Sequence, residues 1–210
     1  MTLKLYVGSK RISSWSLRPY VALMHAGLPF EHTTILLDRA STRDDIARIS
    51  PSGRVPALHD GDVVVWDSLA ICEYVNEIAP EARLWPADRA QRARARAVSA
   101  EMHSGFAAMR RDLTMDVCAD KPGQGHTPEA LADVRRVCAI WREALAASGG
   151  PFLFGAFSIA DAMFAPVTTR FTTYGVELDD ACRGYVAAVA ALPAMQAWRR
   201  DAATEPTSPS

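Results

Sequence analysis

Apolar and polar positions follow two different periods in the first part of the chain. They alternate as in a β-strand over residues 3–7 and fit a second strand over 29–37, whereas the apolar positions of residues 13–26 have helical spacing. Gly27 follows the helical pattern directly, and glycine commonly ends a helix at that place. The chain is therefore expected to begin with a β-α-β unit whose two strands are parallel.

The next pattern predicts a hairpin between two helices. After a short helix near 42–49, a short strand containing Pro56 leads to an Asp60-Gly61 turn and an apolar strand over 63–66. A helix then opens at Asp67-Ser68. Proline lacks a backbone donor, so Pro56 suits a sheet edge, a bulge or a cis turn. The whole N-terminal part thus predicts a βαβαββα domain over residues 1–80.

The pattern after a proline-containing linker is helical throughout. The helices expected from spacing and capping residues cover 88–116, 128–148, a segment capped by Ser158 and Asp161, 179–191 and 194–203. Residues 87–204 therefore predict an all-α helical-bundle domain, and the fold class is α+β. The polar, proline-containing residues 205–210 are expected to be disordered.

Composition excludes several classes of function. The chain has 210 residues, of which 49% are hydrophobic and 22% charged, and its formal net charge of −1 gives no argument for binding nucleic acid. No apolar run approaches the roughly 20 residues of a membrane span, and the N-terminus lacks a signal peptide's cleavage site. The four cysteines are widely separated, without metal-ligand spacing. We expect a cytoplasmic protein with reduced thiols and no metal.

The region around Pro56 and Asp67 carries the clearest candidate chemistry. A helix that begins at Asp67-Ser68 offers free N–H groups and a partial positive charge, which suit a carboxylate. Backbone that is free to pair lies next to it in the predicted hairpin. A small peptide with free termini needs both features, and this is the ligand class we expect.

The order and spacing of these motifs resemble the cytosolic glutathione transferases over residues 1–203. The Val55-Pro56 dipeptide, the Asp67-Ser68 helix start and the all-helical second domain all fit that family, whose N-terminal domain is thioredoxin-like. The segment Ser13-Ser14-Trp15-Ser16-Leu17-Arg18 is similar to the Ser-Ser-x-Ser-x-Arg signature of the zeta-type, serine-class members. Residues 101–110 resemble a subgroup of proteobacterial transferases, and Ser158 with Asp161 matches the family's capping box.

The resemblance implies a set of glutathione-binding residues. The backbone of Val55, before a cis Pro56, would pair with the cysteinyl part of glutathione, while Asp67 and Ser68 would hold the γ-glutamyl amine and carboxylate. A serine at the first helix start would donate a hydrogen bond to the sulfur, and Ser13 ranks ahead of Ser14 because it matches the first serine of the signature.

Trp15 stands where the zeta pattern usually has cysteine, so a bulky indole is expected beside the sulfur. Arg54 is either a solvated loop charge or a partner of a glutathione carboxylate. His103 and Arg110 are seven residues apart on one expected helical face, and either line the electrophile pocket or make interhelical contacts. The family also implies an apolar electrophile as second substrate and a homodimer, with the N-terminal domain of one subunit against the helical domain of the other.

Simpler readings of the same residues remain open. Ser13, Ser14 and the Asp67-Ser68 pair could be plain helix caps. The leading hypothesis is a glutathione transferase that stabilises the thiolate with a serine hydroxyl. The alternative is a binding or regulatory protein of the same fold without turnover. A thiol–disulfide reductase is disfavoured, because no cysteine lies at the first helix start.

Overall fold

Four strands form one mixed sheet in the computed structural model, which describes residues 2–206. The strands are β1 (Leu3–Gly8), β2 (Phe30–Ile35), β3 (Ala57–Asp60) and β4 (Val63–Trp66), in the spatial order β2-β1-β3-β4. β1 is parallel to β2 and antiparallel to β3, and β3 and β4 form the hairpin. The predicted β-α-β start and the hairpin are confirmed, and β2 lies within the range expected, ending two residues before its limit.

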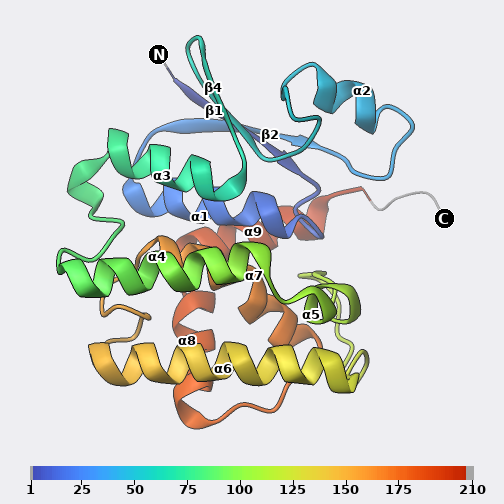
Figure 1. Cartoon of the computed structure of the whole chain (residues 1–210). Coiled ribbons are helices and arrows are strands. Elements are labelled where there is room, and N and C mark those ends of the chain that lie inside the picture. Colours follow the sequence, from blue (N-terminus) through green and yellow to red (C-terminus); the bar gives the residue numbers. More distant parts are fainter. Residues whose placement is uncertain (1, 207–210) are drawn as a thin grey trace.

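The helices of the N-terminal domain are α1 (Ser14–Ala26), α2 (Thr42–Ala47) and α3 (Ser68–Ile78). In Figure 1, α1 and α3 lie side by side under one face of the sheet, and α2 lies beyond the end of β2. Gly27 ends α1 in the left-handed conformation with φ 68°, as its position after the helical pattern predicted. The apolar faces of β1 and α1 meet here in the N-terminal part of the core.

The C-terminal helical domain follows a single 3-10 turn at Pro80–Ala82. Its helices are α4 (Arg89–Ser104), α5 (Ala107–Asp112), α6 (Pro128–Ser148), α7 (Ile159–Thr173), α8 (Asp180–Ala190) and α9 (Pro193–Thr204). Figure 1 shows α4 and α7 below α1 and α9 beside it, with α6 and α8 further from the sheet. α7 is the central helix, since it contacts α1, α4 and α8 and nearly all of its side chains are buried.

A capping box fixes the start of this central helix. The carboxylate of Asp161 is fully buried and accepts hydrogen bonds from the Leu153 N–H at 3.0 Å, the Ser158 N–H at 2.8 Å and the Ser158 hydroxyl at 2.9 Å. Burial raises the pKa of Asp161 to about 6, against the opposing effect of these donors. The box predicted from Ser158 and Asp161 is therefore confirmed.

The single long helix expected over 88–116 is wrong. α4 ends at Ser104, and Phe106 takes a left-handed conformation with φ 63° before α5 begins. A Cβ at Gly105 would lie 2.8 Å from the carbonyl oxygen of Glu101, so the chain is closely packed on itself at this break. His103 and Arg110 consequently lie on different helices, and the expectation that they share one helical face was also wrong.

The expected disorder of residues 205–210 is only partly testable. Glu205 is held in place, because its carboxylate accepts hydrogen bonds from the backbone N–H groups of Lys10 and Arg11. That part of the prediction was wrong, since a sequence pattern does not show a contact 195 positions away. Residues 207–210 lie outside the described part of the chain.

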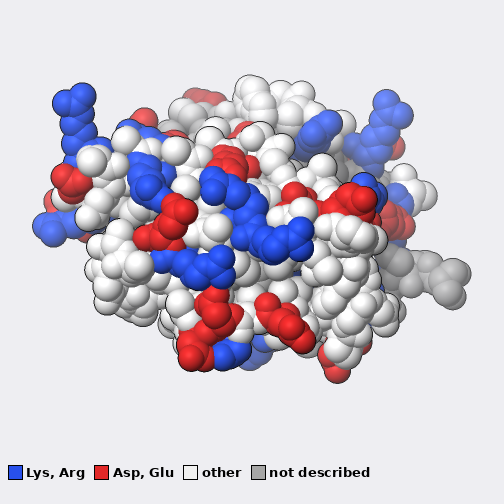
Figure 2. Space-filling view, turned by 60° about the horizontal axis from the view of Figure 1, so that its bottom comes forward, with Lys and Arg blue, Asp and Glu red and all other residues white. Residues whose placement is uncertain are grey.

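Opposite charges are interspersed on the helical face shown in Figure 2, where Lys and Arg side chains gather near the middle with Asp and Glu around them. Ion pairs account for part of this mixture, such as Arg136 with Glu101 and Arg94 with Glu143. None of the helices in residues 2–206 has the length and apolar character to cross a membrane.

Candidate functional site

A cavity of about 550 Å³ lies where the start of α1, the Pro56 loop, the start of α3 and the end of α4 meet. Its lining residues are Trp15, Ser52, Arg54, Val55, Pro56, Trp66, Asp67, Ser68 and His103. Most of the residues singled out from the sequence are therefore brought together in one place. A hollow of about 600 Å³ between β2 and α2 contains none of them.

Three predicted residues do not line the cavity, and two unpredicted ones do. Ser13, Ser14 and Arg110 are not among the lining residues, whereas Ser52 and Trp66 are. Trp66 ends edge strand β4 and is 46% exposed, so it was recognisable from the sequence only as an apolar strand residue.

The loop before β3 presents unpaired backbone to this cavity. The Val55–Pro56 peptide bond is cis, which confirms one of the arrangements predicted for Pro56. The β3 ladder starts at Ala57, and neither the N–H nor the C=O of Val55 bonds to another described residue. Val55 can therefore pair with an extended ligand backbone as a further strand would.

The start of α3 offers both an acid and free donors. Asp67 is the N-cap, and its Oδ1 accepts hydrogen bonds from the N–H groups of Leu69 at 2.9 Å and Ala70 at 3.3 Å. The N–H of Ser68 has no partner within residues 2–206. Asp67 has φ 73°, a conformation that is costly outside glycine and that is concentrated at functional sites. This helix end can hold a carboxylate and an ammonium group side by side.

The serines at the start of α1 are buried and directly precede the lining residue Trp15. The Ser13 hydroxyl donates a hydrogen bond to Ser16 Oγ at 2.8 Å, and Ser16 Oγ also accepts one from the Gly8 N–H at 3.0 Å. A Cβ at Gly8 would lie 3.0 Å from both Ser13 Oγ and Val55 Cγ2, so the Ser13 hydroxyl lies close to the Val55 loop. The side chain of Ser13 does not cap α1, and the Ser14 hydroxyl bonds to no other described residue.

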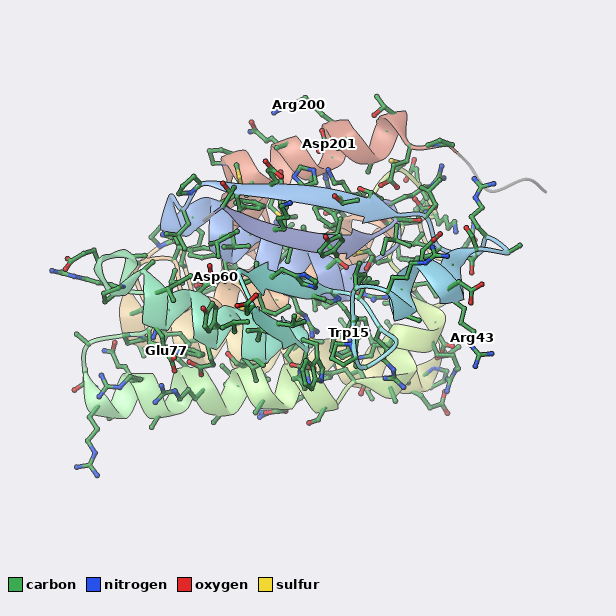
Figure 3. All side chains as sticks on the ribbon, turned by 90° about the horizontal axis from the view of Figure 1, so that it is seen from above. Trp15, Arg43, Asp60, Glu77, Arg200 and Asp201 are labelled. Carbon is green, nitrogen blue, oxygen red and sulfur yellow. The ribbon has the colours of Figure 1, made fainter. Side chains whose placement is uncertain are left out.

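Trp15 is the large side chain at the centre of the site and is labelled in Figure 3. Its ring makes an edge contact with the ring of His103, with centroids 5.2 Å apart. Two guanidinium groups lie against it, that of Arg18 at 4.4 Å and that of Arg110 at 5.0 Å from the ring centroid. The indole therefore separates two cations from the cavity and is attracted to both.

Arg110 stabilises the break between α4 and α5. Its Nε donates a hydrogen bond to the Gly105 carbonyl at 2.9 Å, and its Nη2 donates another to the Met102 carbonyl. These carbonyls belong to the end of α4, where the helix leaves acceptors without internal partners. Of the two alternatives for Arg110, the contacts seen are those between helices.

Arg18 is fully buried and has few partners for its charge. Its Nη1 donates a hydrogen bond to Ser68 Oγ at 3.2 Å, while Nε and Nη2 bond to no other described residue. Burial, with a further contribution from the nearby Arg110, lowers the pKa of Arg18 to about 9. The sequence showed Arg18 only as part of a signature, because its burial depends on packing between α1, α3 and the helical domain.

His103 connects the two domains through Asp67. Its Nε2 lies 3.2 Å from Asp67 Oδ2, so the neutral ring donates from that nitrogen. Desolvation lowers the pKa of His103, and Arg18 and Arg110 add to this, whereas Asp67 raises it. The contact places His103 at the acidic end of the cavity.

Arg54, the cysteines and possible metal ligands are the other groups singled out from the sequence. Arg54 is exposed at the cavity and forms no ion pair with the described residues, so its charge is available to a ligand. Cys72, Cys138 and Cys182 are buried free thiols, and Cys118 is an exposed one. Between residues 2 and 206 no three His, Cys, Asp or Glu side chains are grouped to hold a metal ion.

Two family models match almost the whole chain. Residues 12–78 match the model described as glutathione S-transferase, N-terminal domain, and residues 89–201 match the one described as glutathione S-transferase, C-terminal domain.

Two curated relatives match over about two fifths of their length. Glutathione S-transferase Z1 of Arabidopsis thaliana is 45% identical over 92 residues, which are 43% of this chain and 41% of the relative. The protein LigF of Sphingobium sp. is 42% identical over 100 residues, which are 46% of this chain and 38% of the relative. The match thus spans about two fifths of these relatives.

Solved structures agree over the full chain. A glutathione transferase homolog from Burkholderia, crystallised with bound glutathione, has a TM-score of 0.74 at 26% identity and covers 97% of this chain and 98% of its own. A glutathione S-transferase from the Antarctic clam Laternula elliptica has the same TM-score at 21% identity, covers 98% of this chain and 95% of its own, and supports the fold alone.

Proposed function

This chain belongs to the glutathione S-transferase family, and from that we propose that it binds glutathione in the cavity described above and directs the thiolate at an apolar electrophile. The observation that carries the proposal is the meeting of unpaired Val55 backbone with the acid and free donors of Asp67 and Ser68 at one cavity. A γ-glutamyl peptide has the complementary groups, namely an extended amide and an adjacent ammonium and carboxylate.

The residues of the cavity take separate parts of the ligand in this proposal. The backbone of Val55 pairs with the cysteinyl residue, because its N–H and C=O have no partner among the described residues. The Ser68 hydroxyl and N–H donate to the γ-glutamyl carboxylate, and Asp67 accepts from the ammonium group. Arg54 is close enough to the cavity to hold the second carboxylate of the peptide.

Ser13 is the proposed donor to the glutathione sulfur. A free thiol has a pKa of about 8.5, so a hydrogen bond to the thiolate is needed to populate it at neutral pH. The proton leaves to solvent, and the thiolate then forms a bond to the electrophilic carbon. Proximity to Val55 supports Ser13, although its hydroxyl must turn away from Ser16 to reach the ligand. Ser14 is the second candidate, because its hydroxyl has no partner in the described structure.

The second substrate would enter beside Trp15 and Trp66, whose rings give that end of the cavity its apolar surface. His103 lies at the acidic end instead, so we propose that it acts on the glutathione side rather than on the electrophile. Arg110 contributes indirectly, by holding the end of α4 and the Trp15 ring.

We also propose a homodimer in the cytoplasm. The exposed apolar side chains of Val63 and Trp66 on edge strand β4, and of Ile78 on α3, give a surface that a second copy can cover. Sedimentation velocity tests this directly, since a stable species at the chain mass of 22.8 kDa would contradict a dimer.

Calorimetric titration of glutathione into the wild type, Ser13→Ala and Ser14→Ala at two pH values tests the function. We expect the wild type to bind and release a proton near neutral pH, and Ser13→Ala to bind without that release. Proton release that persists in Ser13→Ala but not in Ser14→Ala would assign the donor to Ser14. A wild type that does not bind would contradict the proposed function.

A binding protein without turnover is the second candidate. The chain is 25% identical over 161 residues, which are 77% of this chain and 72% of the relative, to a stringent starvation protein A homolog of Haemophilus ducreyi. Glutathione binding combined with no conjugation, peroxide reduction or isomerisation across a broad electrophile panel would favour this candidate over the enzyme.

A further inference from the structure

The loop that leads into the site is bonded to the helical domain through its own backbone. The N–H of Lys10 donates to Glu205 Oε1 at 2.7 Å, and the N–H of Arg11 donates to Glu205 Oε2 at 3.2 Å. The carbonyl of Lys10 accepts from Trp198 Nε1 at 2.6 Å, and that of Arg11 accepts from the Val117 N–H at 3.1 Å. All four backbone polar groups of this dipeptide therefore have partners in the C-terminal half of the chain.

The side chain of Lys10 strengthens the same connection. It is almost fully buried, and its ammonium group donates to the carboxylate of Asp201 and lies 2.7 Å from His32 Nε2. The same group lies 5.6 Å from the ring centroid of Tyr20 and 5.7 Å from that of Trp198. The charge is thus neutralised and packed, and it fixes α9 against the start of the loop.

A tight turn connects the bonded Lys10-Arg11 dipeptide to the site. The N–H groups of Ile12 and Ser13 both donate to the carbonyl of Ser9, at 3.1 and 2.8 Å, which makes a tight turn directly after the restrained dipeptide. Ser9 is itself fixed, because its hydroxyl accepts from the Leu37 N–H at 2.8 Å. Only one residue, Ser14, separates this turn from Trp15 in the cavity wall.

We propose that Glu205 is a positioning residue for the glutathione site, an inference that rests on the proposed function. One carboxylate bonded to two successive N–H groups makes two charge-assisted hydrogen bonds, which fix the direction of the loop. Glu205 acts on the loop from the side of α9, and in the view of Figure 3 the strands lie between Asp201 of α9 and Trp15. Glu205 thereby sets where the serine hydroxyl stands relative to the bound sulfur.

The experiment compares Glu205→Ala and Glu205→Gln with the wild type and with Glu177→Ala as a matched control. Glu177 is an exposed acid that bonds to no other described residue, and it lies outside the site. Three quantities are measured for each protein: the affinity for glutathione by calorimetry, the pKa of the bound thiol from the ultraviolet absorbance of the thiolate as the pH is varied, and the melting temperature.

We expect Glu205→Ala to bind glutathione about tenfold more weakly and to raise the pKa of the bound thiol, because small displacements of a catalytic group have large effects. Glu205→Gln retains one acceptor oxygen, so its glutathione affinity and thiol pKa should lie between those of the wild type and Glu205→Ala. Both quantities should be the same in Glu177→Ala as in the wild type. A merely structural role would lower the melting temperature without moving the thiol pKa.

An affinity and thiol pKa unchanged in Glu205→Ala would overturn the inference while leaving the proposed function intact. If Glu205→Ala does not fold, the glutathione affinity and thiol pKa of Glu205→Gln decide instead, since glutamine is close in shape to glutamate. A wild type that does not bind glutathione would instead remove the proposed function, and the inference with it.

Discussion

Replacement of Arg18 by methionine removes the most isolated charge in the described structure while keeping an unbranched apolar stem. The guanidinium is fully buried, donates one hydrogen bond, to Ser68, and has two nitrogens without partners among the described residues. No carboxylate forms an ion pair with it within residues 2–206. Buried charges are usually paired. The effect of removing Arg18 therefore depends on whether the cost of burying its charge exceeds the gain from its hydrogen bond and ring contact.

The cost of burying the Arg18 charge and the gain from its contacts nearly cancel. The pKa of Arg18 falls to about 9, chiefly because of burial, and the shift means that its surroundings cost the charged form about 5 kcal/mol. Against this stand one charge-assisted hydrogen bond to Ser68, which contributes about 1.5–3 kcal/mol, and the contact with the Trp15 ring, which contributes about 2 kcal/mol when desolvated. We therefore expect Arg18→Met to be as stable as the wild type or about 1 kcal/mol more stable.

Urea denaturation at neutral pH measures this, with the midpoint and the slope fitted separately because only an unchanged slope allows the midpoints to be compared. Arg18→Lys is the control, since it keeps the charge but loses the planar group that stacks on Trp15, and we expect it to be the less stable variant. A loss of more than about 2 kcal/mol in Arg18→Met, with Arg18→Lys unchanged, would show that the buried charge itself stabilises the fold.

Two other predictions concern titratable groups. Asp161→Ala leaves the buried N–H groups of Leu153 and Ser158 without their acceptor. We expect urea denaturation to show that the free energy of unfolding falls by about 2–5 kcal/mol. Asp161→Asn keeps one acceptor oxygen, and an equal loss in that variant would contradict this account. His103 should titrate in an NMR experiment with a midpoint below 6.5, because desolvation lowers its pKa, so the folded state loses stability through this group as the pH falls below 6.5. Asp67→Asn should lower that midpoint further, and a rise would show that the carboxylate does not stabilise the charged ring.

The features predicted correctly from the sequence are those set by neighbouring residues. The hairpin follows from the Asp60-Gly61 turn between two short strands, and the end of α1 follows from Gly27. The capping box at Ser158 needs only an acid three residues later. Pro56 restricted its own peptide bond to a few arrangements, one of which is present. Each of these sequence patterns spans four residues or fewer, so a short stretch of the chain is enough to recognise it.

The features missed depend on contacts between distant segments. Residues 88–116 have helical spacing throughout, yet Phe106 is turned into the left-handed region where it is buried in the core, and Arg110 bonds the carbonyls that the break leaves free. The burial of Arg18 requires both domains to be in place. The cavity could be anticipated as a group of residues, but its walls at Ser52 and Trp66 could not, because they are set by how the hairpin packs.

The partners of the Lys10-Arg11 backbone also bear on how the protein is made. During synthesis the four-stranded sheet is complete once β4 has left the ribosome, whereas the side chains that hold Lys10 lie 188 and 195 positions after Lys10 itself. Domains generally form in order from the N-terminus as the chain emerges. The nascent chain therefore carries a formed sheet with a loose entrance loop for most of its synthesis time, and it gains an ordered ligand site only with its final helix.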